Sequence, residues 1–532
     1  RHTGDFSMFR VYMGKDGKPA EYSTENVPLK PKHHLPVNIK GVKEGDFAMI
    51  MGYPGSTDRY LSSYGVQQAI DIKGPTVVEV RDLKLKTMKN RMDAKEQVDI
   101  QYSAKYAQTA NYWKYYQGQT EQLQTNKVVV RKKQLEDQFV KWYSADPERQ
   151  KKYRAALEDI STYYKLTNEY TVGNTYVMEA GVRGPDFVLF AFRTSRLLGA
   201  IESNKAKMDA KIEAATDKSE KKELKKARKS AVKGLISRLE TLSEEHFKNY
   251  NKILEEELVA NLFDLYYKKV NKEQHPPFFA NVNEADFKEY ARKLFKTSPL
   301  MKKGKMKRLI RKLKLGMKLK KIDEDQAIIA ANDFLGMYFG SAKKFAEAEK
   351  KMEEGYKLFV EGIRLMLPEK SFYPNANSTQ RLTYGSVLSY PVSDRVKKMV
   401  RSKDGLDTFF TTMEGLIEKE DKNNPEFEIP ARLKELYEAK DYGQYADENG
   451  KLRVNFLTNN DITGGNSGSP VIDGNGYLIG TAFDGNWEAM SGDISFENKV
   501  QRTISVDIRY TLFIIDKYAG ARHLIDEMTV IK

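Results

Sequence analysis

The spacing of apolar residues changes twice along this chain of 532 residues. Residues 1–80 and 371–532 carry short apolar runs rich in Val, Tyr and Gly, which is typical of strands and their turns. Residues 81–370 instead carry apolar positions at helical spacing, with few Gly or Pro. The pattern predicts an α+β multidomain chain in which a helical domain over 81–370 separates two β-rich segments, 1–80 and 371–532. A helix is expected near the C-terminus of the second segment.

Residues 463–470 read Thr-Gly-Gly-Asn-Ser-Gly-Ser-Pro and lead into an apolar run. A serine that attacks a carbonyl must sit on a tight turn beside converging backbone N–H groups. Glycines permit such a turn, so Ser467 is the candidate nucleophile, and the N–H groups of Gly465 and Ser467 form the candidate oxyanion hole. This pattern is that of the nucleophile loop in trypsin-fold serine proteases. A non-catalytic hairpin loop is the alternative that these eight residues leave open.

Two segments near the N-terminus fit the same fold. Asp5 stands at the head of an apolar run, where the aspartate of a trypsin-like triad accepts the Nδ1–H of the catalytic histidine. Residues 43–55 form a strand pattern followed by a glycine turn, as at the start of the second barrel of that fold. Asp46 in this segment is expected to be a turn residue. The sequence thus predicts a trypsin-like antiparallel β-barrel domain with a large inserted α-helical domain.

The histidine of the triad is the missing element. In the trypsin order it precedes the aspartate, and only His2 precedes Asp5, too close along the same strand to serve. We therefore expect this chain to be the C-terminal part of a longer protein with the histidine upstream, and to be inactive alone. The six histidines are expected to be structural or exposed: His2, His33, His34, His246, His275 and His523.

The amino-acid composition limits which cofactors and binding partners are expected. The absence of cysteine excludes disulfides and a thiol nucleophile, no metal or cofactor motif is found, and no apolar run reaches the roughly 18 residues of a membrane span. The net charge of +15 suggests nucleic acid. However, the basic segment 302–321 lacks interleaved aromatic residues and is expected to pack its apolar side on neighbouring helices, while 205–233 resembles one mixed-charge surface helix. No nucleic-acid partner is therefore expected.

The chain resembles the bacterial dipeptidyl-peptidase seven/eleven family, which are exported serine exopeptidases with a trypsin-like double barrel and an inserted helical domain. The resemblance covers essentially the whole chain. Its landmarks are the loop at 464–470 and the segments 1–7, 110–114, 372–374, 382–385 and 482–490.

The resemblance implies a role for each candidate residue. Asp5 and Ser467 would belong to the triad, while Asn111 and Asp484 would bind the free N-terminus of an oligopeptide substrate. At the position of Gly485, family members that prefer substrates with Asp or Glu before the scissile bond carry an arginine. A pocket without that charge, and left open by the missing side chain, is expected to favour apolar or aromatic residues.

The expected function is therefore that of a serine exopeptidase that releases dipeptides and needs no cofactor. A periplasmic, cell-surface or secreted location follows from the resemblance, and a homodimer is left open. Two other functions also remain open. A trypsin-fold endoprotease would share Asp5 and Ser467 but would not need a free substrate N-terminus. A non-catalytic, basic binding protein would tolerate loss of the Ser467 hydroxyl.

Overall fold

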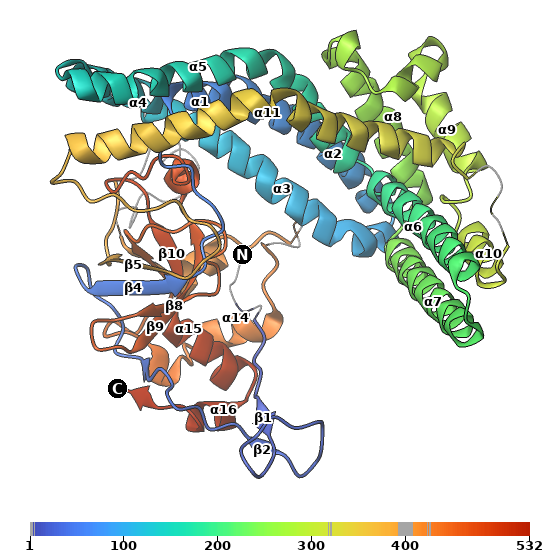
Figure 1. Ribbon diagram of the computed structural model, residues 1–532. Helices are drawn as coiled ribbons and strands as arrows, with labels where there is room; N and C mark the ends of the chain where they lie inside the picture. The colour runs from blue at the N-terminus through green and yellow to red at the C-terminus, as the bar shows by residue number, and fades with distance from the viewer. Residues whose placement is uncertain are drawn as a thin grey trace. The chain divides into compact units, whose positions relative to one another are not determined.

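The computed structural model describes residues 4, 6–317, 319, 322–391, 408–422, 424 and 427–532. The chain divides into two compact units. One unit, here the β unit, comprises Arg1–Tyr60 and Phe372–Lys532. The other, the helical unit, is the intervening Leu61–Ser371 (Figure 1). The chain is thus of the α+β class that the sequence predicts.

A sheet of mainly antiparallel strands forms the centre of the β unit. Its strand order is β5-β4-β8-β9-β10-β7-β6, and β3 pairs in parallel with both β9 and β11. A separate two-stranded hairpin joins β1 and β2. The strands are β1 (Tyr12–Met13), β2 (Val27–Pro28), β3 (Val37–Asn38), β4 (Phe47–Gly52), β5 (Arg381–Ser386), β6 (Phe410–Thr412), β7 (Arg453–Thr458), β8 (Pro470–Ile472), β9 (Leu478–Gly485), β10 (Thr503–Asp507) and β11 (Val530–Ile531).

The sheet curls until its β5 end meets β7. Val387, just after β5, forms an antiparallel bridge with Thr458, and the N–H of Leu388 donates to the carbonyl of Leu457 at 3.1 Å. Alternate residues of the strands point inward, as the two-residue period of a strand requires. The enclosed core consists of Val42, Ala48, Ile50, Val387, Phe456, Val471, Ile479 and Ala482.

A second core of the β unit lies against short helices. Asp507 accepts from the N–H of Arg509 at 2.9 Å and so caps the helix that follows β10. The same carboxylate holds the buried Arg509 guanidinium through two further hydrogen bonds, of 2.9 and 2.6 Å. Burial of both charges is tolerable because they are paired in this way. The helices are α13 (Met413–Glu418), α14 (Ala431–Glu438), α15 (Ile508–Phe513) and α16 (Arg522–Asp526).

The helical unit contains long helices with defined starts. Asp146 and Asp217 cap their helices by accepting the N–H groups of Arg149 and Glu220, each at 2.8 Å. The bounds are α1 (Ser63–Gln68), α2 (Gly74–Ala94), α3 (Glu96–Thr125), α4 (Val128–Ser144), α5 (Pro147–Tyr176), α6 (Asp186–Ala214), α7 (Lys218–Lys248), α8 (Lys252–Lys269), α9 (Phe287–Thr297), α10 (Lys303–Lys314) and α11 (Gln326–Met366).

The predicted boundary at residue 80 is wrong, because the helices begin at Ser63 and residues 61–80 belong to the helical unit. Their β-branched apolar residues suggested strands. The structure buries Val66 on α1, Ile70 on a π-helical turn (Ala69–Lys73), and Val77 and Val80 on α2. Their separations of three, four and seven residues are those of helical turns, in contrast to the two-residue period of a strand.

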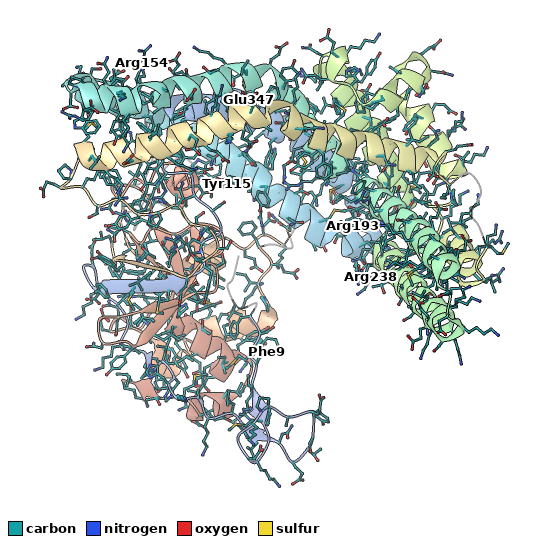
Figure 2. All side chains as sticks on the ribbon, in the orientation of Figure 1. Phe9, Tyr115, Arg154, Arg193, Arg238 and Glu347 are labelled. Carbon is teal, nitrogen blue, oxygen red and sulfur yellow. The ribbon has the colours of Figure 1, made fainter. Side chains whose placement is uncertain are left out.

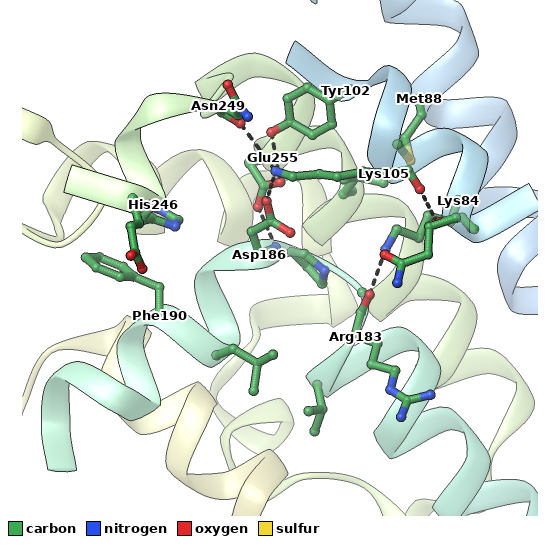
Figure 3. A pocket seen from close by; sticks show the side chains of 18 of the residues that line it. Lys84, Met88, Tyr102, Lys105, Arg183, Asp186, Phe190, His246, Asn249 and Glu255 are labelled. Carbon is green, nitrogen blue, oxygen red and sulfur yellow. Dashed lines mark hydrogen bonds and ion pairs between the residues drawn. The ribbon is translucent and has the colours of Figure 1, made fainter. Parts of the chain in front are cut away.

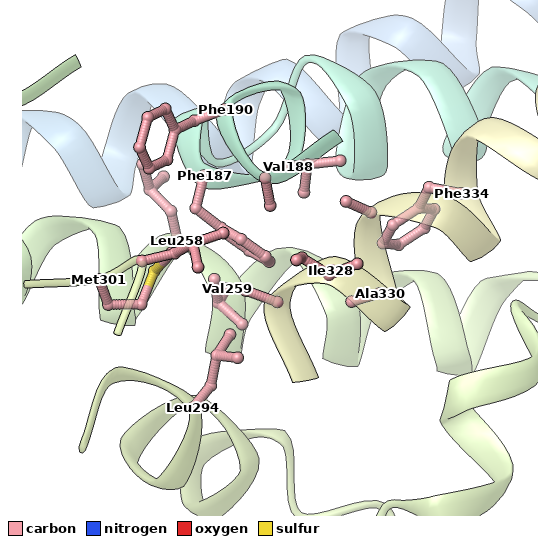
Figure 4. Close-up of a cluster of buried hydrophobic side chains, with 14 of the residues drawn as sticks. Phe187, Val188, Phe190, Leu258, Val259, Leu294, Met301, Ile328, Ala330 and Phe334 are labelled. Carbon is pink, nitrogen blue, oxygen red and sulfur yellow. The ribbon is translucent and has the colours of Figure 1, made fainter. Parts of the chain in front are cut away.

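The predictions for the two basic segments, 205–233 and 302–321, differ in how well they agree with the structure. Residues 205–233 do not form one helix, because α6 ends at Ala214 and the Asp217 cap starts α7. In the other segment the packing prediction is confirmed for α10, whose apolar face is buried. Met306, Leu309, Ile310 and Leu313 join the core of the helical unit, part of which is shown in Figure 4. Lys318, Lys320 and Lys321 lie outside the described residues.

None of the helices in the described part of the chain is both long enough and apolar enough to cross a bilayer.

A fully buried carboxylate lies inside the helical unit. Glu255 on α8 accepts the hydroxyl of Tyr102 at 3.1 Å and the N–H of Asp186 at 2.8 Å, at the start of α6. Burial, followed by the nearby charge of Asp186, raises the pKa of Glu255 to about 8. The folded protein therefore holds this proton at pH values where an unfolded carboxyl group has lost it.

This shift predicts that the helical unit loses stability as pH rises toward 8, because the unfolded chain releases the proton first. The loss should be on the order of a few kcal/mol. Glu255→Gln should flatten the pH dependence, since an amide keeps an acceptor for Asp186 and a donor for the Tyr102 oxygen. Helix melting should be followed by circular dichroism from about pH 7 upward, where histidine in the unfolded chain is mostly neutral.

Glu245→Gln, at an exposed position of the same unit, is the matched control and should keep the wild-type slope. A wild-type melting temperature that does not fall across this range would contradict the prediction.

Candidate functional site

The loop 463–470 leads into β8 in the β unit. Gly465 and Gly468 have φ values of +108° and +86°, a backbone region that favours glycine. At Gly465 a Cβ atom would lie 2.4 Å from the carbonyl oxygen of Tyr53. The turn after β4 approaches the loop here, and the N–H of Gly55 donates to the carbonyl of Gly464 at 2.7 Å. The loop therefore requires glycine at 465.

The backbone donors of the loop fall into two groups. Two donate within the loop, Asn466 N–H to the Thr463 carbonyl at 3.1 Å and Ser469 N–H to the Asn466 carbonyl at 3.0 Å, and a third, Gly468 N–H, donates to the Ala482 carbonyl on β9 at 2.8 Å. Four N–H groups of the loop have no acceptor among the residues that the structure describes: those of Thr463 and Gly464, and those of Gly465 and Ser467, which are closer in sequence to the Ser467 hydroxyl. The donors at Gly465 and Ser467 are the pair that the sequence assigns to an oxyanion hole.

Ser467 is exposed, and its hydroxyl donates to the carbonyl of Phe483 on β9 at 3.3 Å. The pairing of β9 with β10 is irregular at this point: Ala482 pairs with Ser505 and Asp484 with Ile504, so Phe483 is an extra residue. Such a bulge rotates the side chains that follow it. Phe483 and Asp484 are consequently both exposed, directly beside the serine loop.

The carboxylate of Asp484 accepts the N–H of Gly485 at 2.8 Å. Although the residue is exposed overall, desolvation by the surrounding protein raises the pKa of this carboxyl group, and the hydrogen bond from Gly485 offsets only part of the effect. A cation beside this carboxylate would be stabilised.

Gly485 ends β9 and pairs with Thr503. A Cβ atom on Gly485 would point at the Cβ of Ala489, only 2.9 Å away. The expectation that the missing side chain of Gly485 leaves an open pocket is therefore wrong at the position of a Cβ atom, which is already filled by Ala489. The short helix η8 (Trp487–Ser491) already occupies that direction.

Sequence reasoning missed a polar cluster behind Gly485. Asn486 accepts the N–H of Arg502 at 2.9 Å, and the Arg502 guanidinium donates to the carbonyls of Ser389, Asn498 and Gln501 at 2.7 to 3.0 Å. On η8, both carboxylate oxygens of Glu488 are buried and have no hydrogen-bond partner within the described residues. Nothing local in the sequence signals this cluster, because it joins β9, β10 and a loop after β5.

The other predicted site residues lie elsewhere. Asp5 and His2 are outside the described residues. Asn111 is exposed on α3 in the helical unit. Asp46 is a turn residue as expected, because its carboxylate accepts the N–H of Lys43 at 2.7 Å.

The five described histidines have structural or exposed environments. His246 stacks on Phe190 with ring centroids 4.0 Å apart, and burial lowers its pKa to about 4. His275 contacts the carbonyl of Val270 at 2.8 Å. The remaining three are exposed: His33, His34 and His523.

A family model described as peptidase S46 matches residues 1–530. Among curated relatives, dipeptidyl-peptidase 7 of Phocaeicola vulgatus is 38% identical over 541 residues, covering 100% of this chain and 69% of the relative. The Asp/Glu-specific dipeptidyl-peptidase of Flavobacterium psychrophilum is 35% identical over 534 residues, with 100% and 69% covered. The crystal structure of Porphyromonas endodontalis DPP11 in complex with the dipeptide Arg-Glu matches at 30% identity with a TM-score of 0.82, covering 100% of this chain and 71% of that one.

Proposed function

This chain belongs to the peptidase S46 family, and we propose that it releases dipeptides from the free N-termini of oligopeptides by nucleophilic attack of Ser467. The sequence prediction of a dipeptidyl-peptidase, and so of a hydrolase, is confirmed at the level of the family. The observation that carries the proposed mechanism is the pair of free N–H groups, at Gly465 and Ser467, beside an exposed serine hydroxyl.

In this mechanism the hydroxyl of Ser467 attacks the carbonyl carbon of the scissile bond. The carbonyl oxygen gains negative charge and accepts the N–H groups of Gly465 and Ser467, which need no reorganisation because the loop already holds them. A histidine would take the serine proton, and Asp5 would orient that histidine. We propose that the closed sheet of the β unit is the trypsin-like barrel that supports this loop, and that the helical unit is its inserted domain.

The acceptor for the substrate ammonium is proposed to be Asp484. Asp484 follows Phe483 on β9, and the carbonyl of Phe483 accepts the Ser467 hydroxyl, so the backbone of Asp484 is one residue from the strand position that the nucleophile contacts. Its raised pKa reflects poor solvation, which an ammonium ion would relieve. For Asn111 the support is the family resemblance together with its exposed amide on α3.

The preferred residue before the scissile bond is proposed to be apolar or aromatic. The relatives include both dipeptidyl-peptidase 7 and Asp/Glu-specific enzymes at similar identity, so the names alone do not decide. Position 485 offers no cation to a substrate carboxylate. The Arg502 guanidinium is saturated by carbonyls, and the buried Glu488 is an acid that offers a substrate carboxylate no positive partner.

The compared relatives belong to bacteria. By family resemblance we propose a periplasmic, cell-surface or secreted location and leave a homodimer as a further proposal. Cell fractionation and light scattering would test these two points.

Ser467→Ala should abolish turnover of a dipeptidyl reporter while leaving the melting temperature unchanged, because the exposed hydroxyl has one weak hydrogen bond to lose. The assay uses the protein expressed from its complete reading frame. Ser469→Ala, two residues away in the same loop, should retain measurable turnover. Equal turnover by Ser467→Ala and wild type would remove this serine from the mechanism, and no turnover by either protein would favour the non-catalytic binding protein.

Asp484→Asn should lower kcat/KM on the order of a hundredfold for reporters with a free N-terminus, because the ammonium loses its charged partner. The hydrogen bond from Gly485 can persist, so the backbone should hold. Acetylated reporters, which lack the ammonium, should be poor substrates of both proteins.

The matched control for this variant is Asp473→Asn. Asp473 accepts turn N–H groups elsewhere in the β unit, so kcat/KM should change little. Wild-type cleavage of acetylated and free reporters at the same rate would identify an endoprotease instead.

Specificity should be switched by an arginine at Gly485 only when space is made for it. The double variant Gly485→Arg with Ala489→Gly removes the methyl group that a Cβ at 485 would meet at 2.9 Å. Wild type should cleave reporters ending in Phe better than those ending in Asp, and the double variant should move that ratio toward Asp by roughly a hundredfold.

Ala489→Gly alone is the control and should keep the preference for Phe. If the ratio in the well-folded double variant equals that of wild type, position 485 does not face the substrate side chain.

A further inference from the structure

A cavity of about 390 Å³ lies within the helical unit, between α2, α3, the start of α6, α7 and α8 (Figure 3). This volume is within the range of pockets that hold small organic ligands, roughly 300–1,000 Å³. All the residues that line it belong to the helical unit, and Ser467 belongs to the other unit. None of the residues proposed for the peptidase site lines the cavity.

Positive charge is in excess along the wall. Asp186 pairs with Lys105, and Glu255 is held by the Tyr102 hydroxyl and the Asp186 N–H, as the dashed lines in Figure 3 show. Those acids are therefore already used within the wall. The remaining charged groups are one acid, Glu245, and three cations: Lys84, Arg193 and Arg183, of which only Arg183 is paired with an acid among the described residues, Glu179 at 3.7 Å.

Neither Lys84 nor Arg193 forms an ion pair with a residue that the structure describes. The ammonium of Lys84 donates to the carbonyl of Arg183 at 2.7 Å, and burial lowers its pKa. The guanidinium of Arg193 has no hydrogen bond or ion pair with any residue that the structure describes. An anion in the cavity would give both groups a charged partner, and charge-assisted hydrogen bonds are the stronger kind.

Part of the cavity wall is apolar and aromatic. The rings of His246 and Phe190 are nearly parallel, with 3° between their planes, and Leu189 and Leu242 extend this surface. The low pKa of His246 keeps its ring neutral near pH 7. Its Nε2 atom is buried and has no partner in the described structure, which leaves one hydrogen-bonding position unfilled.

We propose that this cavity binds a small organic anion in which a carboxylate is joined to an aromatic or apolar group. Lys84 and Arg193 would contact the carboxylate, and the apolar group would lie against Phe190 and His246. A ligand of this kind uses both the excess charge and the apolar wall. Inorganic anions use only the first feature and neutral aromatics only the second.

Calorimetric titration of the 532-residue chain with 3-phenylpropanoate tests the proposal directly. The matched neutral ligand is 3-phenylpropanamide, and inorganic phosphate is the anion without an apolar part. The carboxylate should bind, whereas the amide and phosphate should bind at least about tenfold more weakly. Equal affinity for carboxylate and amide would overturn the role of the cations, and no binding at millimolar concentrations would overturn the site.

Two variants locate the bound molecule. Lys84→Met and Arg193→Met keep apolar length, remove one charge each, and should each raise the Kd about tenfold. Arg238→Met is the control, because Arg238 is an exposed arginine on α7 that does not line the cavity, whereas Arg193 on α6 does (Figure 2). Its Kd should equal that of wild type. Unchanged affinity in Arg193→Met, whose exposed side chain has no structural partner to lose, would place the ligand elsewhere and refute the proposal even if Lys84→Met failed to fold.

Discussion

Two hydrogen bonds between the loop 463–470 and strand β9 determine the geometry of the candidate site. Gly468 N–H donates to the carbonyl of Ala482 at 2.8 Å, and Ala482 N–H donates back to that of Ser469 at 2.9 Å. From the other side, the Tyr53 carbonyl leaves room only for the hydrogen of Gly465. Because the loop is clamped on both sides, its unused donors have fixed positions before any substrate arrives. Such preorganisation is the main requirement of an oxyanion hole.

The contacts of the loop 463–470 join residues from both sequence segments of the β unit. A contact between the ends of these two segments explains how they form one unit despite the long segment between them. The β unit is interrupted between Tyr60 and Phe372, and the rings of these two residues stack with centroids 6.4 Å apart. The Tyr60 hydroxyl also donates to the carbonyl of Tyr373. With the two ends held together, the length of the intervening segment adds little closure entropy. The helical unit has its own large apolar core, so it can fold around its own contacts.

The sequence was most informative where the physical requirement is local. The turn at 463–470 needs glycines at fixed offsets from Ser467, so one short segment predicted both the nucleophile and the free N–H groups of Gly465 and Ser467. The bulge at Phe483 could not be predicted in this way, because it depends on the register between β9 and β10. The same holds for Gly55, whose N–H contacts a loop about four hundred residues away. The strand prediction over 61–80 failed because β-branched residues also fit a buried helix face.

Positive potential at the serine loop and negative charge on β9 lie at neighbouring positions. The free N–H groups of Gly465 and Ser467 create positive potential where a carbonyl oxygen would lie, while β9 carries the carboxylate of Asp484 just beyond Phe483. Strand residues advance by about 3.3 Å each, and an extended dipeptide spans roughly twice that distance. A peptide that placed its scissile carbonyl on the two donors would therefore bring its N-terminus into the range of this carboxylate. The buried Glu488 and the inward-turned Arg502 reinforce this polarity, since neither offers positive charge to a substrate. In the proposed mechanism, the site would therefore bind a peptide through its scissile carbonyl and its free ammonium group, and the contacts at Gly485 would decide the side-chain preference.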